Sequence, residues 1–342
     1  MKQLNNYILK NLSINFFSIF LPLFVIASVV FLIRVSSITS VIEINIFEMF
    51  KLYLFILPDL LFYTLPLSFF IGGVLTFSKL SFNSEMVVIF SLGVPPKFLL
   101  NILLKLATLL SLFLLFDSMV MIPHTKQMYK EFVKYKQQEA VLNIKATEFG
   151  QEFGSWSLFI ESITENGKNK LYNNIALFHK KHDEEEKFIV AEKAVIKTSN
   201  GIVKLYLQNG SIFSYKKDKI TKIFFQKMKI NDLTTINDFY YKSTFEYFLY
   251  SLTNEKRRIK LIANIILSML PLMSIFLIIS IGVQNNRYGK SITNLFIGLS
   301  IISYYFLTFY FSKSIDFQAF LLIPIWFLFS YIIYYYRILL RY

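Results

Sequence analysis

The sequence predicts an α-helical membrane protein with six transmembrane helices and an antiparallel, jelly-roll-like β domain that faces away from the cytoplasm. Apolar residues make up 55% of the 342 residues, above the roughly 45–50% of soluble proteins. Of the 36 basic and 22 acidic residues, 24 and 16 lie between positions 124 and 260. The sequence therefore divides into an apolar N-terminal region, a polar centre and an apolar C-terminal region.

Six apolar segments outside the polar centre are each about 20 residues long, the length that crosses a bilayer as a helix. They are 11–33, 52–78, 98–122, 261–283, 292–311 and 317–336. The predicted domains are 1–123 with the first three helices, 124–258 with the β domain, and 259–342 with the last three. The first segment is expected to stay as an uncleaved anchor, because its apolar core is longer than that of a signal peptide.

Basic residues in the short connections predict the orientation of the helices. One set of helix ends carries Lys2, Lys10, Lys79, Lys97, Arg287, Lys290, Arg337 and Arg341, whereas the other carries Arg34, Lys51 and Lys313. This bias places both termini in the cytoplasm and the polar domain on the outer side.

The polar centre has the pattern of a β domain. Val203, Leu205 and Leu207 alternate with polar residues, as in a half-buried strand. Further strands are expected at 156–163, 171–180, 187–197, 211–216 and 220–230. Asn166-Gly167, Asn200-Gly201 and Asn209-Gly210 are typical hairpin turns. Strands about ten residues apart favour an antiparallel sandwich or jelly roll.

No catalytic constellation is found in the sequence. Gly289-Lys290-Ser291 ends like a phosphate-binding loop, but Gln284 stands where that loop needs a glycine. We therefore expect no ATPase site and no bound cofactor in this chain. His179 and His182 lack metal-site spacing and are more simply a solvated hairpin tip, so no metal site is predicted. The absence of cysteine excludes disulfides.

The connection between the second and third apolar segments predicts a short cytoplasmic helix within about 81–93. Ser81 or Asn83 can cap its start, and Gly93 followed by two prolines can end it. A helix that merely joins two spans, with Glu85 complementing its dipole, is the simpler interpretation of this segment.

The motifs of this region resemble the LptF/LptG (YjgP/YjgQ) permease family. The resemblance lies in the paired prolines Pro58 and Pro66, in Lys79-Leu80, in Asn83-Ser84-Glu85 and in Leu92-Gly93-Val94. The segments 254–258 and 287–290 also fit, and the order of three helices, β insert and three helices matches over the whole length. Asn83 replaces the usual Asp of the family and Met86-Val87 replaces Leu-Thr. The LptF branch fits slightly better than the LptG branch.

The resemblance implies a permease subunit of an ATP-driven exporter, located in the bacterial inner membrane with its β domain in the periplasm. Such a subunit extracts lipopolysaccharide from the inner membrane and passes it to a periplasmic bridge. The implied partners are a homologous permease, a cytoplasmic ATPase dimer that hydrolyses the ATP, and periplasmic jelly-roll proteins; nucleic acid is not expected. The implied ATPase-coupling residues are Asn83, Ser84, Glu85, Met86, Ile89, Phe90 and Gly93.

Four basic residues near the outer ends of the helices are candidates for binding the phosphates of lipid A: Arg34, Arg257, Arg258 and Lys313. A guanidinium group binds phosphate through two parallel hydrogen bonds, although Arg34 could simply extend towards lipid headgroups. Asp59 and Asp117 lie within or near spans, and we expect each to bond a tyrosine, a serine or the backbone of a neighbouring helix.

Two alternative functions remain open at this point. One is another ATP-driven lipid or lipoprotein extractor, which commonly has four spans with the outer domain after the first. The other is a membrane-anchored scaffold whose β domain binds a partner without transport. The arrangement of spans argues against the first, and the predicted coupling helix against the second.

Overall fold

The computed structural model describes residues 2–39, 45–142, 151–153, 156–166, 169–179, 186–199, 202–216, 219–231, 244–284, 293–314 and 316–340. The chain divides into two compact units. The helical unit comprises Met1–Ile38, Asn45–Tyr129 and Tyr241–Tyr342, and the other unit comprises Thr39–Ile44 and Lys130–Tyr240.

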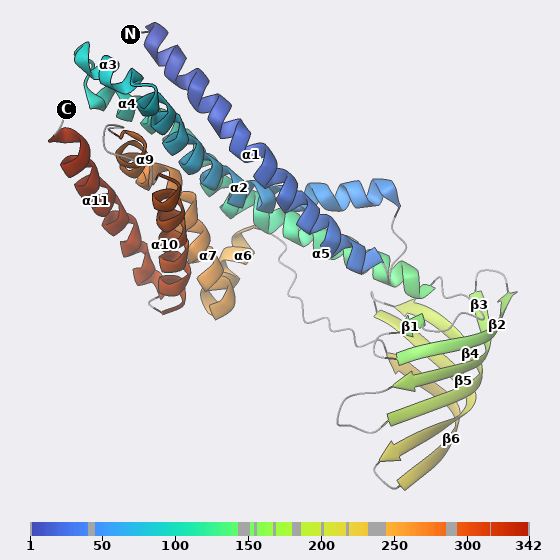
Figure 1. Cartoon of the computed structure of the whole chain (residues 1–342). Helices are drawn as coiled ribbons and strands as arrows, with labels where there is room; N and C mark the ends of the chain where they lie inside the picture. Colours follow the sequence, from blue (N-terminus) through green and yellow to red (C-terminus); the bar gives the residue numbers. More distant parts are fainter. Residues whose placement is uncertain are drawn as a thin grey trace. The chain divides into compact units, whose positions relative to one another are not determined.

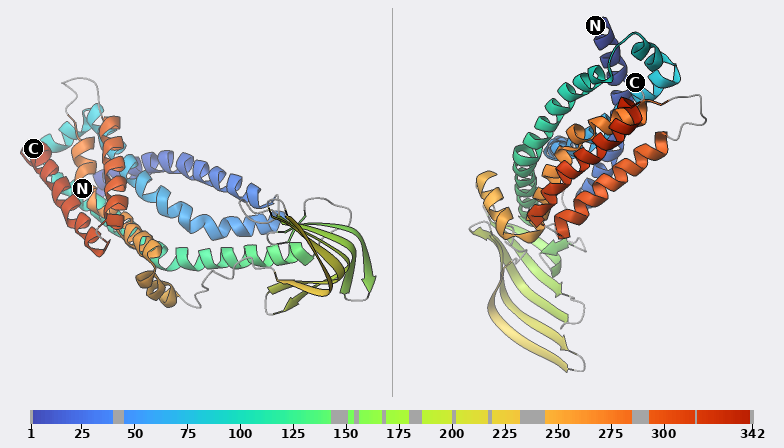
Figure 2. Two further views of the ribbon diagram at one scale, coloured as in Figure 1. Left: turned by 90° about the horizontal axis from the view of Figure 1, so that it is seen from below. Right: turned by 90° about the vertical axis from the view of Figure 1, so that its left-hand side faces the viewer.

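The helical unit is built from long apolar helices joined by short ones. They are α1 (Lys2–Thr39), α2 (Ile46–Phe82), α3 (Glu85–Ser91), α4 (Pro96–Phe116), the π-helical turn η1 (Asp117–Met121), α6 (Thr244–Thr253), α7 (Glu255–Ser268), α8 (Leu270–Met273), α9 (Ile275–Gly282), α10 (Thr293–Ser314), the 3-10 helix η3 (Asp316–Leu321), α11 (Leu322–Tyr334) and the π-helical turn η4 (Tyr335–Leu339). Helix α5 (Ile122–Leu142) begins in this unit. Both termini lie at the same end of the unit as α3 (Figures 1 and 2).

Five stretches of the described residues are long and apolar enough to cross a membrane. They are Lys2–Ile33, Ile46–Phe82, Pro96–Val133, Thr293–Ser314 and Asp316–Leu339. These stretches correspond to the first, second, third, fifth and sixth predicted spans. The predicted count of six transmembrane helices is not confirmed, because the segment 261–283 is divided among the three shorter helices α7, α8 and α9.

Pro271 lies at the break in this segment. Pro271 has no backbone N–H and so interrupts the helical hydrogen bonds. Neighbouring helices supply replacements: the Tyr304 hydroxyl donates to the Ile266 carbonyl at 2.6 Å, and the Ser330 hydroxyl donates to the Met273 carbonyl at 3.0 Å. The Trp326 indole N–H donates to the Ser274 hydroxyl at 3.3 Å. A broken helix is tolerated in a membrane when its exposed backbone groups find such partners.

Glycines let α2 approach two neighbouring helices closely. A Cβ atom at Gly72 would lie 2.9 Å from the Cα of Phe16 in α1, and one at Gly73 would lie 2.9 Å from the Ile278 side chain in α9. On the opposite side of that contact, a Cβ at Gly282 would lie 2.6 Å from the Phe77 Cβ. Small residues at such crossings are the usual basis of helix packing in membranes.

The second unit contains one antiparallel sheet of six strands in sequential order. The strands are β1 (Gln151–Phe153), β2 (Trp156–Asn166), β3 (Asn169–His179), β4 (Glu186–Ser199), β5 (Ile202–Lys216) and β6 (Lys219–Asn231). The predicted antiparallel β domain is therefore confirmed. A jelly roll interleaves its strands in two Greek keys, whereas the strands described here form a simple up-and-down meander.

A transverse row of polar residues crosses five of these strands, and we call it the crease. Its members are Glu161, Asn174, Glu192, Asn209 and Gln226. The regular residue pairing is interrupted at this row between each pair of neighbouring strands, although the register is the same on both sides of it. No strand thus has an extra residue relative to its neighbour. The interruption of the pairing lies at the same level in all five strands. Asn174 and Asn209 have positive φ angles of 49° and 51°.

The crease shifts the alternation of buried and exposed residues by one position. In β4, Ile189 and Ala191 are buried, Glu192 and Lys193 are both exposed, and Ala194 is buried again. The corresponding exposed pairs in β2, β5 and β6 are Glu161-Ser162, Gln208-Asn209 and Gln226-Lys227, and in β3 the half-buried Asn173 precedes the exposed Asn174. A shift of one residue would otherwise turn the apolar face of a strand to solvent. The bent strands (Figure 2) instead contribute residues from both sides of the crease to one buried cluster.

One predicted hairpin is wrong for this reason. Asn209-Gly210 was expected to end one strand and begin the next, but β5 continues through it from Ile202 to Lys216. Asn readily adopts a left-handed conformation. At Asn209 this conformation occurs inside a continuous strand, at the crease, and not in a turn. The other two Asn-Gly turns lie partly or wholly outside the described residues.

We predict that Gly72→Val destabilises the helical unit by about 2 kcal/mol, because the added side chain overpacks the contact with α1. Thermal unfolding of the full-length protein in detergent measures the effect. Gly298→Val in α10 is the matched control, since a Cβ there has no neighbour within 4 Å. Equal unfolding temperatures for the two variants would contradict the proposed close approach.

Candidate functional site: a short helix and an ion-paired cluster

Helix α3 follows α2 through a two-residue elbow. Asn83 ends α2, with its N–H bonded to the Lys79 carbonyl at 3.0 Å, and Ser84 adopts a left-handed φ of 61°. Neither Ser81 nor Asn83 caps the start of α3 as predicted, and the Ser84 side chain makes no capping bond. Gly93 has a φ of +81° after the end of α3, and Pro96 begins α4.

Two faces of α3 differ sharply in burial. Met86 (1% exposed) and Ile89 (7%) belong to the core of the helical unit. Val87, Val88 and Leu92 are exposed, Leu92 to 77%. Of the predicted coupling residues, Met86 and Ile89 therefore anchor the helix, while the exposed apolar face is formed by residues outside that predicted set. An apolar residue at every position of 86–90 hid this asymmetry in the sequence.

Glu85 connects α3 to the beginning of α1. Its Oε2 atom accepts a hydrogen bond from the Tyr7 hydroxyl at 2.7 Å, and its Oε1 atom accepts one from the Asn83 side-chain amide at 3.1 Å. The carboxylate is thus held on the first turn of α3, where it also complements the helix dipole. Tyr7 was not predicted, because nothing in the sequence pairs it with position 85.

The end of α2 is also fastened to the end of α9. The Ser81 hydroxyl donates to the Gly282 carbonyl at 3.3 Å and accepts from the Gln284 N–H at 3.3 Å. Residues on both sides of the elbow are therefore bonded to other helices of the unit: Glu85 to α1 and Ser81 to α9.

A second polar feature joins α2 to α5. The Lys126 ammonium group donates to the Asp59 carboxylate at 2.7 Å, and the two side chains are only 34% and 24% exposed. The partner of Asp59 is thus a lysine and not the tyrosine, serine or backbone group that was expected. Asp117 in η1 is 1% exposed, and neither of its carboxylate oxygens has a hydrogen-bond partner in the described part of the chain.

The predicted phosphate-binding residues are only partly brought together. Arg258 donates through Nε to the Asp316 carboxylate at 2.8 Å and through NH1 to the Leu252 carbonyl at 3.1 Å, so it joins α7 to η3. Lys313 is exposed in the last turn of α10, three residues before Asp316. The Arg34 side chain lies outside the described residues, as do Arg287 and Lys290.

The long apolar helices, the broken fourth span and the antiparallel sheet define a multi-pass membrane protein with a β domain. The family model of the lipopolysaccharide export system permease LptF/LptG matches residues 6–337. The chain therefore belongs to the LptF/LptG family, and it is a permease component of a lipopolysaccharide export system in the inner membrane. No curated protein matches the chain at a significant level.

We predict that Asp59→Asn destabilises the helical unit by roughly 1–3 kcal/mol, because it leaves the partly buried Lys126 ammonium without its counter-charge. The double variant Asp59→Asn, Lys126→Gln should recover part of this loss. Thermal unfolding in detergent of the wild type, both single variants and the double variant gives the coupling energy. Additive effects of the two single changes would show that the pair does not couple α2 to α5.

Proposed function

We propose that this chain is one of two related permease subunits of an ATP-driven exporter that extracts lipopolysaccharide from the inner membrane. On this proposal the termini and α3 face the cytoplasm, and the β domain faces the periplasm and passes the lipid to a bridge of similar β domains. ATP is hydrolysed by a separate cytoplasmic ATPase dimer. The basic residues counted at the short connections support this orientation.

The observation that carries the proposal is the construction of α3. A helix that only joined two spans would have no need of an exposed apolar face next to a buried one. The exposed side chains of Val87, Val88 and Leu92, together with Phe82 before the elbow, suit insertion into a groove of another protein. Because Met86 and Ile89 fix the other face in the core, a movement of α3 would be transmitted to α2.

The Glu85 carboxylate gives this movement a second route. Its bond to the Tyr7 hydroxyl joins α3 to α1, so that a displacement of α3 would also act on the first span. Large apolar side chains of α1 and α10 are exposed along their lengths, among them Phe17, Val25 and Ile33 in α1 and Leu299, Ile302 and Phe306 in α10. These faces are the surfaces that we assign to the partner permease and to lipid, in agreement with a lateral path between the subunits.

The free edge of the sheet is the surface that we assign to the bridge. Among the described strands, β6 pairs with β5 alone, and it has 13 residues where the opposite edge strand β1 has three. Ile220 and Ile223 on β6 are mostly exposed. A long edge strand with exposed apolar side chains, even one that also carries lysines as β6 does, can pair with a strand of another protein.

We predict that Glu85→Arg weakens association with the ATPase at least tenfold and lowers lipid-stimulated ATP hydrolysis, because it reverses a charge and removes the acceptor of the Tyr7 hydroxyl. Co-purification and ATPase assays of the reconstituted complex measure both effects. Glu85→Gln, which keeps the shape and an acceptor oxygen, should retain most of the association. Wild-type assembly and export by Glu85→Arg would refute the coupling role.

A photoreactive residue at Ile223 in β6 should form cross-links to a periplasmic β-domain protein, because a bridge strand would pair along that edge. The same residue at Phe178, in the interior strand β3, is the control and should give no such product. Cross-linking in cells, followed by identification of the adducts, is the measurement. Adducts at Phe178 but not at Ile223 would place the bridge elsewhere on the domain.

A further inference from the structure

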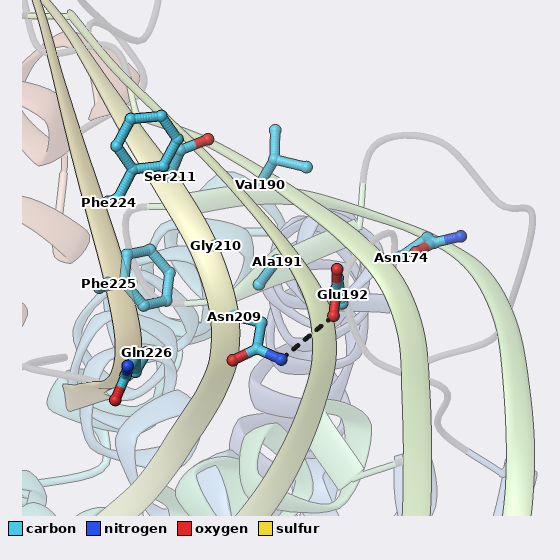
Figure 3. Close-up of a pocket in the computed structure, with 10 residues that line it drawn as sticks. All are labelled: Asn174, Val190, Ala191, Glu192, Asn209, Gly210, Ser211, Phe224, Phe225 and Gln226. Carbon is cyan, nitrogen blue, oxygen red and sulfur yellow. Dashed lines mark hydrogen bonds between the residues drawn. The ribbon is translucent and has the colours of Figure 1, made fainter.

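We propose that the crease of the β domain is a carbohydrate-binding site that recognises sugar rings of the transported glycolipid. The crease crosses β2 to β6, and beside it the sheet has a hollow of about 660 Å3 (Figure 3). The hollow is lined by Asn174, Val190, Ala191, Glu192, Asn209, Gly210, Ser211, Phe224, Phe225 and Gln226.

The polar side of the hollow is a regular array of planar hydrogen-bonding groups. The Asn209 amide donates to the Glu192 carboxylate at 3.2 Å, as Figure 3 shows, and the Asn174 amide donates to the Glu161 carboxylate at 2.7 Å. Each bond orients a side chain and leaves further donor and acceptor positions on it, because an amide has two N–H groups and a carboxylate has two oxygens. Neighbouring strands space these groups about 4.8 Å apart.

The apolar side of the hollow is the Phe224 ring, which is largely open to solvent and has the Lys222 ammonium group 4.6 Å from its centroid. Phe224 is 75% exposed on β6 and pairs in register with Ser211, which in turn pairs with Val190. Gly210, which pairs with Phe225 on the next strand, has no room for a side chain. A Cβ atom there would clash with the Val190 carbonyl and would meet the Phe225 ring at 2.5 Å.

A sugar ring matches this arrangement better than other ligands. Its hydroxyl groups bond to oriented amides and carboxylates, while the C–H groups on its face pack against the electron-rich face of an aromatic ring. A phosphate in the hollow would meet the Glu192 carboxylate, whose negative charge disfavours it. An acyl chain would remove the solvent from five polar side chains without bonding to them, which is costly.

The bend of the sheet does not by itself require these side chains. The left-handed positions of the crease would be occupied at lower cost by glycine, and the exposed Phe224, which contacts Lys222, is not part of the buried cluster. The chain instead has Asn at both left-handed positions and Glu, Glu and Gln on the strands between and beside them. The inference rests on the proposed function in one respect: the proposed export of lipopolysaccharide identifies the glycolipid from which the sugar would come.

Binding of a deacylated and dephosphorylated glucosamine disaccharide to the full-length protein in lipid nanodiscs tests the inference. Isothermal titration calorimetry, with saturation-transfer NMR for weak binding, should show saturable binding by the wild type. Phe224→Ala and Gln226→Ala should each weaken it about tenfold, through loss of the ring or of the amide. Asn209→Gly should do the same, since glycine keeps the left-handed backbone while removing the side chain. Phe178→Ala, an exposed aromatic residue outside the hollow, should bind as the wild type does.

The absence of saturable binding by the wild type, or equal affinity of all these variants, would overturn the inference. Tighter binding of inorganic phosphate, of a detergent acyl chain or of a peptide at the same residues would overturn it as well. Because the assay uses neither ATP nor the partner subunits, its outcome is separate from that of the proposed function. A complex that exports lipopolysaccharide while the crease variants bind the disaccharide normally would refute the carbohydrate site alone.

Discussion

The close approach of α2 to its neighbours is the constraint on which the helical unit depends. Lipid does not drive apolar helices together, so they associate through tight packing and polar bonds. Gly72 and Gly73 provide that packing towards α1 and α9, and Gly282 provides it from the side of α9. Polar bonds of α2 to other helices lie on both sides of the glycines, with Asp59 to Lys126 before them and Asn15 to Thr76 and Ser81 to α9 after them.

The sequence was a good guide to the spans and a poor guide to what holds them together. Uninterrupted apolar length identifies a membrane helix because backbone groups in lipid must bond within the helix. It could not show that 261–283 is broken at Pro271, since a proline within an apolar segment is compatible with both a kink and a break. The break is stable because Tyr304 and Ser330, from other helices, bond to the Ile266 and Met273 carbonyls. The same limit applies to Glu85 and Tyr7, which are 78 positions apart.

The β domain shows a different limit. Alternation found the strands, but the alternation rule assumes that a strand keeps its phase from end to end. In five strands the alternation of buried and exposed residues shifts by one position at the crease. The two consecutive polar residues Gln208 and Asn209 therefore suggested the end of a strand, although β5 continues through them. The dipeptide Asn209-Gly210 is ambiguous by its chemistry, because a left-handed Asn serves a turn and an interior bend equally well. Only the register with β4 and β6 separates the two.

The crease also explains how one meander can bury a core. A flat sheet exposes both of its faces and needs a second layer to cover one of them. When all five strands shift phase at the same level, the apolar residues on both sides of the crease stay on one side of the bent sheet. Ile175 and Leu177 from one side and Leu205 and Leu207 from the other thus join a single buried cluster. The consecutive polar residues at the bend are the ones that this geometry leaves exposed to water. Because they lie in one row across the sheet, they form the polar surface to which we assign a ligand.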